Sequence, residues 1–212
     1  MAMVDLTGLV YEGMWTYGPP VPEVRLSRLA AIAAQGWDAH LMHMANIQGT
    51  AIETGAHLLP GVPTIDLLPP ERFFVHCAVL QLPEKAPREH ITRDELEAAA
   101  VPIEPGTGIL VAVGWDRMWD EPTFFWDSPH FTAQAMDWIV EQRPVLFGLD
   151  IPSANDPYAP EGLLMPFFRT GALLIAPLVN LRRLSKPYVD LIALPLRIRD
   201  LCGTPCRAVA VE

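Results

Sequence analysis

The sequence predicts a single α/β domain in which strands dominate and about three helices are inserted. Short apolar runs bounded by turn residues are typical of strands, and only a few segments have the length and apolar spacing of a helix. No internal repeat, linker or low-complexity tract divides the 212 residues, a length that suits one hydrophobic core. The 22 prolines are spread among apolar segments, which predicts a rigid, loop-rich surface rather than disorder.

Strands and one long loop are expected in the N-terminal part of the chain. A short strand over residues 4–6 leads into a turn-rich loop that carries Tyr11, Trp15 and Tyr17. These aromatic side chains either line a pocket or cover the edge of the core, since aromatic residues bury well in both settings. Further strands are predicted over residues 39–46 and 72–82.

Helices and strands follow one another in the rest of the chain. Thr92 and Glu95 have the spacing of a capping box and open a short helix over residues 92–100. Apolar spacing predicts two further helices, over residues 132–143 and 162–170. Strands are predicted over residues 108–114, 145–149, 172–181, 188–198 and 206–211.

Residues 46–66 have the composition of a functional site. Their glycines and prolines supply the sharp turns that allow a backbone to approach a ligand closely. Glu53 and His57 are four residues apart, so the carboxylate can orient an imidazole whose pKa lies near neutral pH. The alternative is a surface carboxylate and an unrelated loop histidine.

Asp150 and Ser153 directly follow the strand expected over residues 145–149. Ligands gather at the carboxyl ends of parallel strands in open α/β sheets, so these two residues are candidates for a second wall of the pocket. The alternative for Asp150 is an aspartate that caps a turn.

The charge of the chain restricts its partners. A net charge of −10 argues against nucleic acid and anionic membranes, which bind clustered Lys and Arg, and favours a small, uncharged substrate. No apolar run is long enough to span a membrane, and the start of the sequence lacks a signal-peptide pattern, so we expect a cytoplasmic protein. No G-x-G-x-x-G or P-loop motif is present, and no cofactor is expected.

The three cysteines, Cys77, Cys202 and Cys206, are expected to be reduced structural thiols. An odd number without dense spacing does not indicate a disulfide framework. Cys202 and Cys206 flank Gly-Thr-Pro, which suggests the two ends of a hairpin turn rather than a zinc knuckle.

The histidines do not have the spacing of a metal site. His76 lies in an apolar strand and is expected to be a core histidine, whereas His90 and His130 are expected to be solvated. His40 and His43 would point to opposite faces of their strand. A catalytic metal needs three or four converging ligands, so the residues alone give little support for one.

Several motifs taken together resemble one family along almost the full length of the chain. They are D-L-T near the start, G-T-x-x-(D/E)-x-x-x-H followed by P-G-x-P-T-I-D, V-G-W-D at 113–116, G-L-D-I-P-S at 148–153, and the ending L-I-A-L-P-L-R-I with G-T-P-C-R-A-V-A-V. The chain is similar to the bacterial cyclase family that includes kynurenine formamidase and isatin hydrolase. The resemblance implies a swivelling β/β/α fold, a homodimer or higher homo-oligomer, and a pocket completed by a neighbour's aromatic N-terminal loop, here residues 8–24.

The chain departs from the family motif, H-x-G-T-H-x-D-x-P-x-H, at the positions that bind the family's metal ion. The resemblance places the family's metal-ligand positions on Ile47, Ala51, Glu53, Leu164 and Ala176. Four of these side chains are apolar and cannot donate an electron pair, so we expect the family's metal site to be absent. The family's acid/base histidine corresponds to His57, which remains beside a lengthened carboxylate at Glu53.

We therefore expect acid/base chemistry by Glu53 and His57 without a metal. The predicted reaction is a cyclisation, elimination or isomerisation of a hydrophobic, polyketide-like or aromatic carbonyl compound. Two alternatives are a metal-dependent hydrolase with a rearranged site that uses His40, His43, His57 and Glu53, and a non-catalytic protein that binds a hydrophobic ligand or a partner subunit. Substrate contacts are expected from Trp15, Tyr17, Ile47, Gln48, Thr50, Ala51, Trp115, Asp150, Ser153, Leu164 and Ala176.

Overall fold

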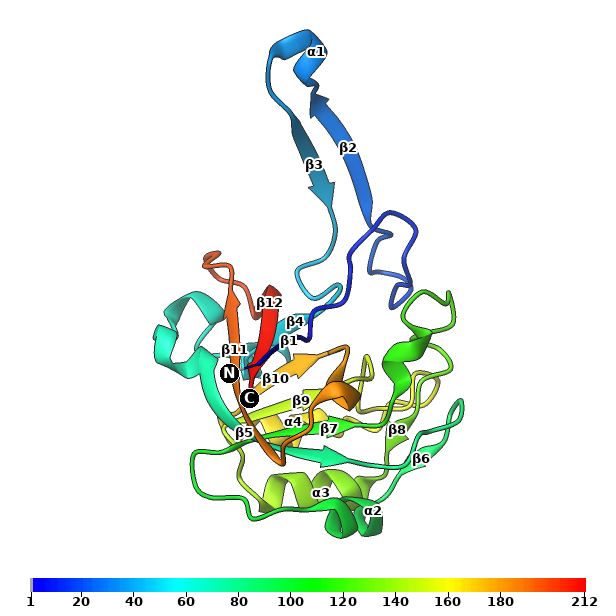
Figure 1. Cartoon of the computed structure of the whole chain (residues 1–212), viewed down its shortest axis with the longest axis vertical. Helices are drawn as coiled ribbons and strands as arrows, with labels where there is room; N and C mark the ends of the chain where they lie inside the picture. Colours follow the sequence, from blue (N-terminus) through cyan, green and yellow to red (C-terminus); the bar gives the residue numbers. More distant parts are fainter. Residues whose placement is uncertain (1) are drawn as a thin grey trace.

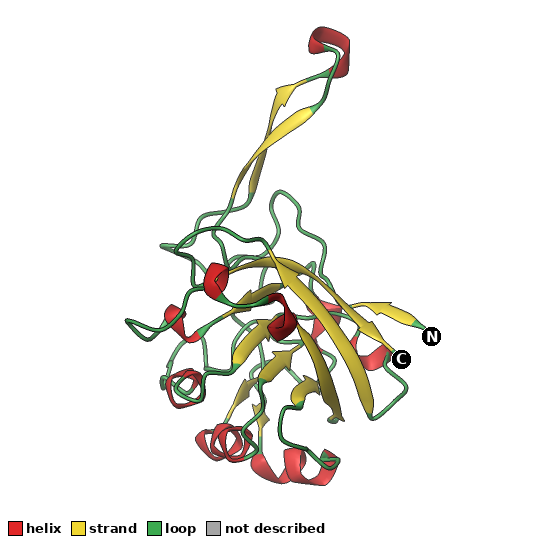
Figure 2. Ribbon diagram, turned by 90° about the vertical axis from the view of Figure 1, so that its left-hand side faces the viewer, coloured by secondary structure: helices red, strands yellow, loops and turns green. Residues whose placement is uncertain are grey.

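A closed sheet forms the centre of the computed structural model, which describes residues 2–212. The strand order is β1-β12-β11-β5-β7-β9-β10-β4, and a further pairing of β12 with β4 closes all strands except β1 into a ring (Figures 1 and 2). The strands of this sheet are Met3–Asp5 (β1), Ala51–Glu53 (β4), Phe74–Gln81 (β5), Gly108–Ala112 (β7), Leu146–Leu149 (β9), Leu173–Ala176 (β10), Tyr188–Pro195 (β11) and Gly203–Val211 (β12). Strands β5, β7, β9 and β10 run parallel, which confirms the predicted α/β class.

Helices cover one outer side of this ring (Figure 1). They are Arg93–Ala99 (α2), Ala133–Glu141 (α3) and Leu164–Phe168 (α4), close to the three predicted helices. The predicted capping box is present, because Thr92 Oγ accepts from the Glu95 N–H and the Glu95 carboxylate accepts from the Thr92 N–H. Within residues 2–212, no helix has the length and apolar composition needed to cross a membrane.

Short elements complete the body of the molecule. A two-stranded sheet pairs β6 with β8, and single 3₁₀ turns connect the longer elements. These elements are His90–Ile91 (β6), His130–Phe131 (β8), Gly55–His57 (η1), Ile65–Leu67 (η2), Pro70–Phe73 (η3), Trp115–Met118 (η4) and Leu181–Arg183 (η5).

Two apolar cores lie on the two faces of the ring. Side chains alternate along a strand, so Leu110 and Ala112 of β7 belong to one core whereas Ile109 and Val111 belong to the other. The second set packs with the helices, including Trp138 of α3, and is called the outer core. The first set fills the ring and is called the inner core.

An arm formed by residues 25–43 projects from the body (Figure 1). It contains strand Arg25–Ala30 (β2), the single helical turn Ile32–Gln35 (α1) and strand Ala39–His43 (β3). The sequence predicted β3 but not β2 or α1. Among the described residues, β2 and β3 pair only with each other, and most side chains of the arm are exposed.

Two histidine predictions are wrong. His76 is not a core histidine, because Val75 and Cys77 face the inner core and His76 points outward to Asp190, 2.8 Å away. His130 is not solvated, because it lies in β8, is buried, and packs edge-on against His90. His90 itself is exposed, as expected.

The hairpin prediction for Cys202 and Cys206 is also wrong. Cys206 lies inside the continuous strand β12 and Cys202 directly precedes that strand, so the chain reverses before both residues. All three cysteines are free, but only Cys77 and Cys206 are buried structural thiols.

Candidate functional site

Glu53 lies at the seam where the ring closes. It pairs with Leu174 of β10 on one side and with Gly203 of β12 on the other. Because Ile52 points into the inner core, its neighbours Ala51 and Glu53 point to the outer face. The fold therefore places a carboxylate among apolar side chains, where only 8% of the residue is exposed.

The turn after β4 returns His57 to Glu53. Thr54 caps the 3₁₀ turn η1, since its hydroxyl accepts from the Ala56 N–H and donates to the Pro63 carbonyl. This brings His57 Nδ1 to 3.2 Å from Glu53 Oε2, so the predicted proximity of the two residues is confirmed. The contact has the distance of an ion pair but not the direction of a hydrogen bond, and Oε2 is buried without a hydrogen-bond partner.

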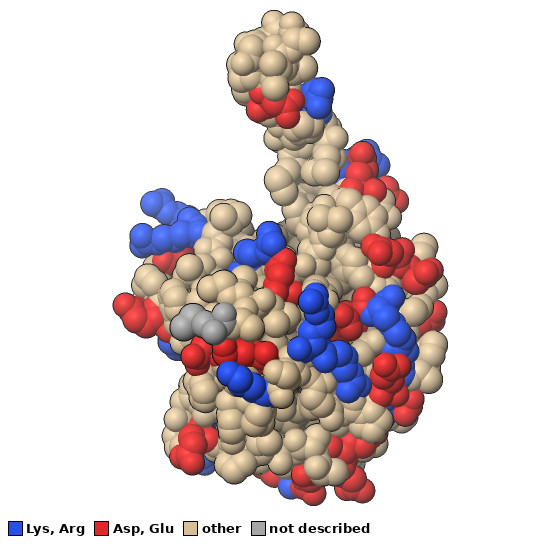
Figure 3. Space-filling model, in the orientation of Figure 1, with Lys and Arg blue, Asp and Glu red and all other residues tan. Residues whose placement is uncertain are grey.

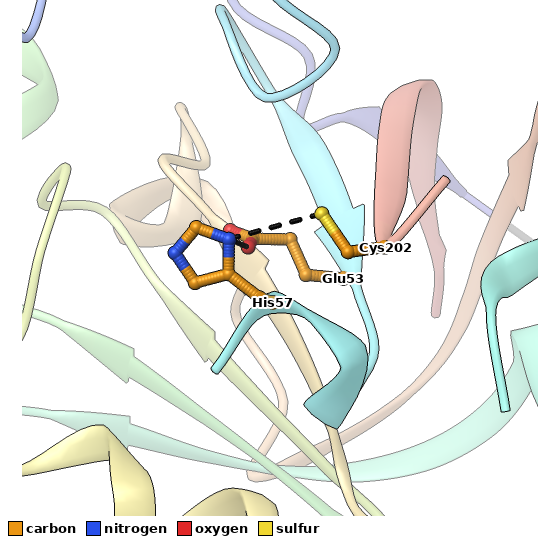
Figure 4. Close-up of side chains that lie close together, drawn as sticks. All are labelled: Glu53, His57 and Cys202. Atoms are coloured by element: carbon orange, nitrogen blue, oxygen red, sulfur yellow. Dashed lines mark hydrogen bonds and ion pairs between the residues drawn. The ribbon is translucent and has the colours of Figure 1, made fainter. Parts of the chain in front are cut away.

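Cys202 is the third member of the cluster (Figure 4). Its Sγ lies 3.8 Å from His57 Nδ1 and 3.5 Å from the Asn46 amide nitrogen, which also donates to the Gly203 carbonyl. The sulfur, the imidazole nitrogen and a carboxylate oxygen all lie within 4.8 Å of one another. The Cys202 sulfur and the Glu53 carboxylate both lie next to Nδ1 of His57. The other ring nitrogen of His57 points away from both groups.

The three groups shift one another's proton affinities. Burial raises the pKa of Glu53, and the nearby His57 opposes this shift only in part. The contact with Cys202 is the main cause that raises the pKa of His57, and the charge of Glu53 adds to it. The contact with His57 lowers the pKa of Cys202, against the effect of burial.

Aromatic residues of the N-terminal loop pack against one another at the outer core. The pKa of Tyr17 is raised, first by burial and then by the charge of Glu53. Trp15 packs edge-on against Tyr17, with ring centroids 5.2 Å apart, and its indole nitrogen is buried without a partner. The Phe168 ring lies 6.4 Å from the ring of His57.

Two of the four apolar residues at the family's metal-ligand positions, Ala51 and Ala176, lie on the strands beside Glu53. Ala51 and Ala176 pair directly across β4 and β10 and share the face of Glu53. Leu164 and Ala176 are packed in the outer core, and Ile47 is half-buried in the preceding turn. None of these side chains has an N, O or S donor, so the metal site of the resembled family does not fit here.

Three of the predicted contact residues are engaged within the fold. The Gln48 amide donates to the Pro22 carbonyl and accepts from the Ala45 N–H. Thr50 Oγ accepts from the Gly8 N–H and donates to the Pro177 carbonyl. Trp115 is fully buried and its indole donates to the Phe124 carbonyl. Gln48 and Thr50 thus connect the turn before β4 to other loops of the chain.

Asp150 caps the turn after β7. Its carboxylate accepts from the Val113 and Gly114 N–H groups and is fully buried, which is the turn-capping alternative considered for this residue. Burial raises the pKa of Asp150 to about 7, although these N–H groups favour the charged form. Ser153 is half-buried and accepts from the Asn155 N–H.

No pattern in the sequence predicted that Cys202 belongs to the site. It lies 145 positions from His57, and only the pairing of β12 with β4 brings the two residues together. His40 and His43 lie on the exposed arm and are not members of the cluster. A rearranged donor set would therefore consist of Glu53, His57 and Cys202 rather than the set expected from the sequence.

Comparison with known proteins supports this description of the fold. Isatin hydrolase A from Ralstonia solanacearum is 21% identical, with a TM-score of 0.86 over 100% of this chain and 92% of that protein. An isatin hydrolase bound to the product analogue thioisatinate is 20% identical, with a TM-score of 0.83 over 99% and 92% of the two chains. A potential metal-dependent hydrolase with cyclase activity is 21% identical, with a TM-score of 0.75 over 99% and 96%.

At this level of identity, the structural similarity establishes a shared fold and not a shared activity. No curated protein matches the sequence. The Cyclase family model, in contrast, matches residues 4–156, which is more than half of the chain. The protein therefore belongs to the Cyclase family.

Proposed function

We propose that the protein is an enzyme that acts on a small, hydrophobic carbonyl compound through proton transfer by Glu53 and His57, without the metal of its relatives. The observation that carries this proposal is the buried, unpartnered Oε2 of Glu53, 3.2 Å from His57 Nδ1. The reactions that such a pair serves are cyclisation, elimination and isomerisation next to a carbonyl group.

Glu53 and His57 lie in different environments, which suit them to different parts of the proton transfer. A carboxyl group whose pKa is raised keeps its proton to a higher pH than an ordinary glutamate does, which suits it to give that proton to a substrate. The His57 side chain is 33% exposed and its outward ring nitrogen is free to face a substrate. The Phe168 ring, 6.4 Å from that of His57, favours a flat, apolar substrate.

Substitutions of the pair test the proposal. With aromatic lactams, lactones and ketones as candidate substrates, Glu53→Gln and His57→Ala should each lower turnover about 10²–10⁴-fold. The exposed residues Glu71 and His43 provide matched controls, and Glu71→Gln and His43→Ala should leave turnover unchanged. If both site variants keep full activity, the pair is not catalytic, and ligand binding without chemistry becomes the better account.

Metal-dependent hydrolysis is a second candidate, favoured by the convergence of three donors. Zinc bonds of about 2.0–2.3 Å place neighbouring ligand atoms roughly 3.2–3.8 Å apart in a tetrahedral site. The distances from His57 Nδ1 to Glu53 Oε2 and to Cys202 Sγ are 3.2 and 3.8 Å. These three residues would hold the ion, which when bound polarises a carbonyl group and acidifies water. Structural neighbours that are named hydrolases add support.

We further propose that the protein is a homodimer held together by the arm. A two-stranded hairpin is at best marginally stable alone in water, yet Ile32, Trp37 and Met42 of the arm are 71%, 57% and 60% exposed. Figure 3 shows few charged atoms along it. With Arg25, Arg28 and Asp38, the arm carries +1 and the rest of the chain −11, which attracts the arm to the body of a second copy.

The body offers an apolar groove of ≈410 Å³ as the docking site. It is lined mainly by Ile65, Leu67, Leu68, Pro69, Pro70, Phe73, Leu194 and Pro195. Reciprocal exchange of arms buries two arms and two grooves around one two-fold axis.

Light scattering should give twice the 23.5 kDa chain mass for the native protein. The double variant Ile32→Asp, Trp37→Ser should be monomeric, while Leu9→Asp on the body should stay dimeric. A native monomer would refute this assembly.

A further inference from the structure

The three cysteines of the chain lie in chemically different environments. Cys77 and Cys206 are buried in the inner core, where burial raises the pKa of both thiols, that of Cys206 to about 12. Cys202, in contrast, is partly exposed. The fold therefore makes one thiol accessible to a ligand and keeps two inert.

Two donors face the sulfur of Cys202. His57 Nδ1 lies 3.8 Å and Asn46 Nδ2 lies 3.5 Å from Sγ, and both stabilise a thiolate. Glu53, 3.2 Å from the same imidazole nitrogen, stabilises the protonated ring. The unpartnered Oε2 of Glu53 is a second, independent indication that this cluster is arranged for a ligand rather than for internal bonding.

We propose that Cys202 is a nucleophile that forms a reversible covalent bond with the carbonyl carbon of the substrate. This inference rests on the proposed function and adds the substrate class, an electrophilic aldehyde, ketone or activated carbonyl compound with an apolar body. Acid/base chemistry by Glu53 and His57 gives no role to the Cys202 thiol, and the covalent step supplies one.

The addition of the Cys202 thiol to the carbonyl group needs no proton donor or acceptor other than His57. The Cys202 thiol gives its proton to His57, and the sulfur lone pair attacks the carbonyl carbon. A C–S bond forms, the C=O π pair moves to oxygen, and that oxygen takes the proton back from His57. The product is a thiohemiacetal or thiohemiketal, without a leaving group, oxidant or reductant. Breaking the C–S bond reverses the step after the attached carbon chain has reacted.

Alkylation of the purified full-length protein tests the proposal without knowledge of the substrate. Iodoacetamide at neutral pH should label Cys202 at least about tenfold faster than it labels glutathione, because His57 and Asn46 stabilise the thiolate. Peptide mass spectrometry should find Cys77 and Cys206 unlabelled, because both are buried. Phenacyl bromide, an aryl α-haloketone, should show a larger preference for Cys202 over glutathione than iodoacetamide does.

Variants identify the cause of the reactivity. His57→Ala should slow labelling of Cys202 about tenfold, and Asn46→Ala should slow it less, whereas Glu71→Gln should have no effect. Labelling no faster than that of glutathione, or unaffected by His57→Ala, would overturn the proposal. So would a thiol that reacts only after treatment with EDTA, because Cys202 would then be a metal ligand.

The two proposals fail in different ways. If Cys202→Ser keeps full turnover while Glu53→Gln and His57→Ala abolish it, the covalent step is wrong and the acid/base function stands. If Cys202 is reactive but Glu53→Gln and His57→Ala leave turnover intact, the thiol is accessible and the proposed proton transfer is wrong.

Discussion

Replacing Glu53 by glutamine tests the site through stability as well as through activity. Glutamine has nearly the shape of glutamate but carries no charge, so the substitution removes the ionisable group and leaves the packing at the seam of the ring. The loss of proton transfer lowers turnover. The removal of a buried charge should at the same time stabilise the fold.

The sign of the stability effect follows from the pKa of Glu53. Burial raises that pKa above the usual value of 4.5, so the folded chain keeps a proton that the unfolded chain has already released. The contribution of Glu53 to stability therefore falls as the pH rises from 4.5 through the raised pKa. Each unit of the shift costs the native protein about 1.4 kcal/mol at high pH. Attraction to His57 opposes this cost, but burial is the larger cause.

Thermal unfolding at pH 4 and pH 8 measures the effect. At pH 8 the melting temperature of Glu53→Gln should exceed that of the native protein by about 3–6 °C for each unit of the pKa shift, for a chain of this size. At pH 4 both side chains are neutral, and the two proteins should melt together. Glu71→Gln, which removes an exposed carboxylate, should show no such difference.

One result would refute this reasoning. If Glu53→Gln melts below the native protein at pH 8, the carboxylate is stabilised where it lies, and burial does not govern its proton affinity. The proposed role of Glu53 in proton transfer would then lose its physical basis.

Three further predictions concern the scaffold. Glu95→Ala removes the capping box of α2 and an ion-pair partner of buried Lys85, so it should lower the free energy of unfolding in urea by about 1–3 kcal/mol. The control Glu97→Ala removes an exposed carboxylate and should lower it by less than about 0.5 kcal/mol. Ile52→Ala opens the inner core at the seam and should cost about 2–5 kcal/mol by the same measurement. Asp150→Ala leaves two buried N–H groups unpaired and should lower the free energy of unfolding by about 2–5 kcal/mol. A decrease of less than about 1 kcal/mol would show that water replaces the carboxylate.

Local patterns in the sequence were sufficient to predict most helices and strands and two of the three members of the cluster. Thr92 and Glu95 predicted the start of α2 because a capping box is a contact within one turn. Glu53 and His57 could be paired because they are four residues apart in a turn-rich segment. Both inferences depend on short-range geometry that the order of residues determines.

Features that depend on distant pairing could not be predicted in this way. Cys202 joins the site only because β12 pairs with β4 and closes the ring. His76 lies in an apolar strand, but its direction depends on which face of β5 the inner core occupies. The arm was missed in part because β2 mixes polar and apolar residues and packs against nothing in its own chain that the structure describes.

Elemental analysis of protein purified without a chelator tests the central claim most directly. The claim is that Glu53 and His57 work without a metal, because Ile47, Ala51, Leu164 and Ala176 provide no ligands where the resembled family has them. The account predicts zinc, manganese and iron well below one ion per chain, unchanged in Cys202→Ser. About one ion per chain in the native protein, lost in Cys202→Ser, would contradict the claim and establish the three-donor metal site instead.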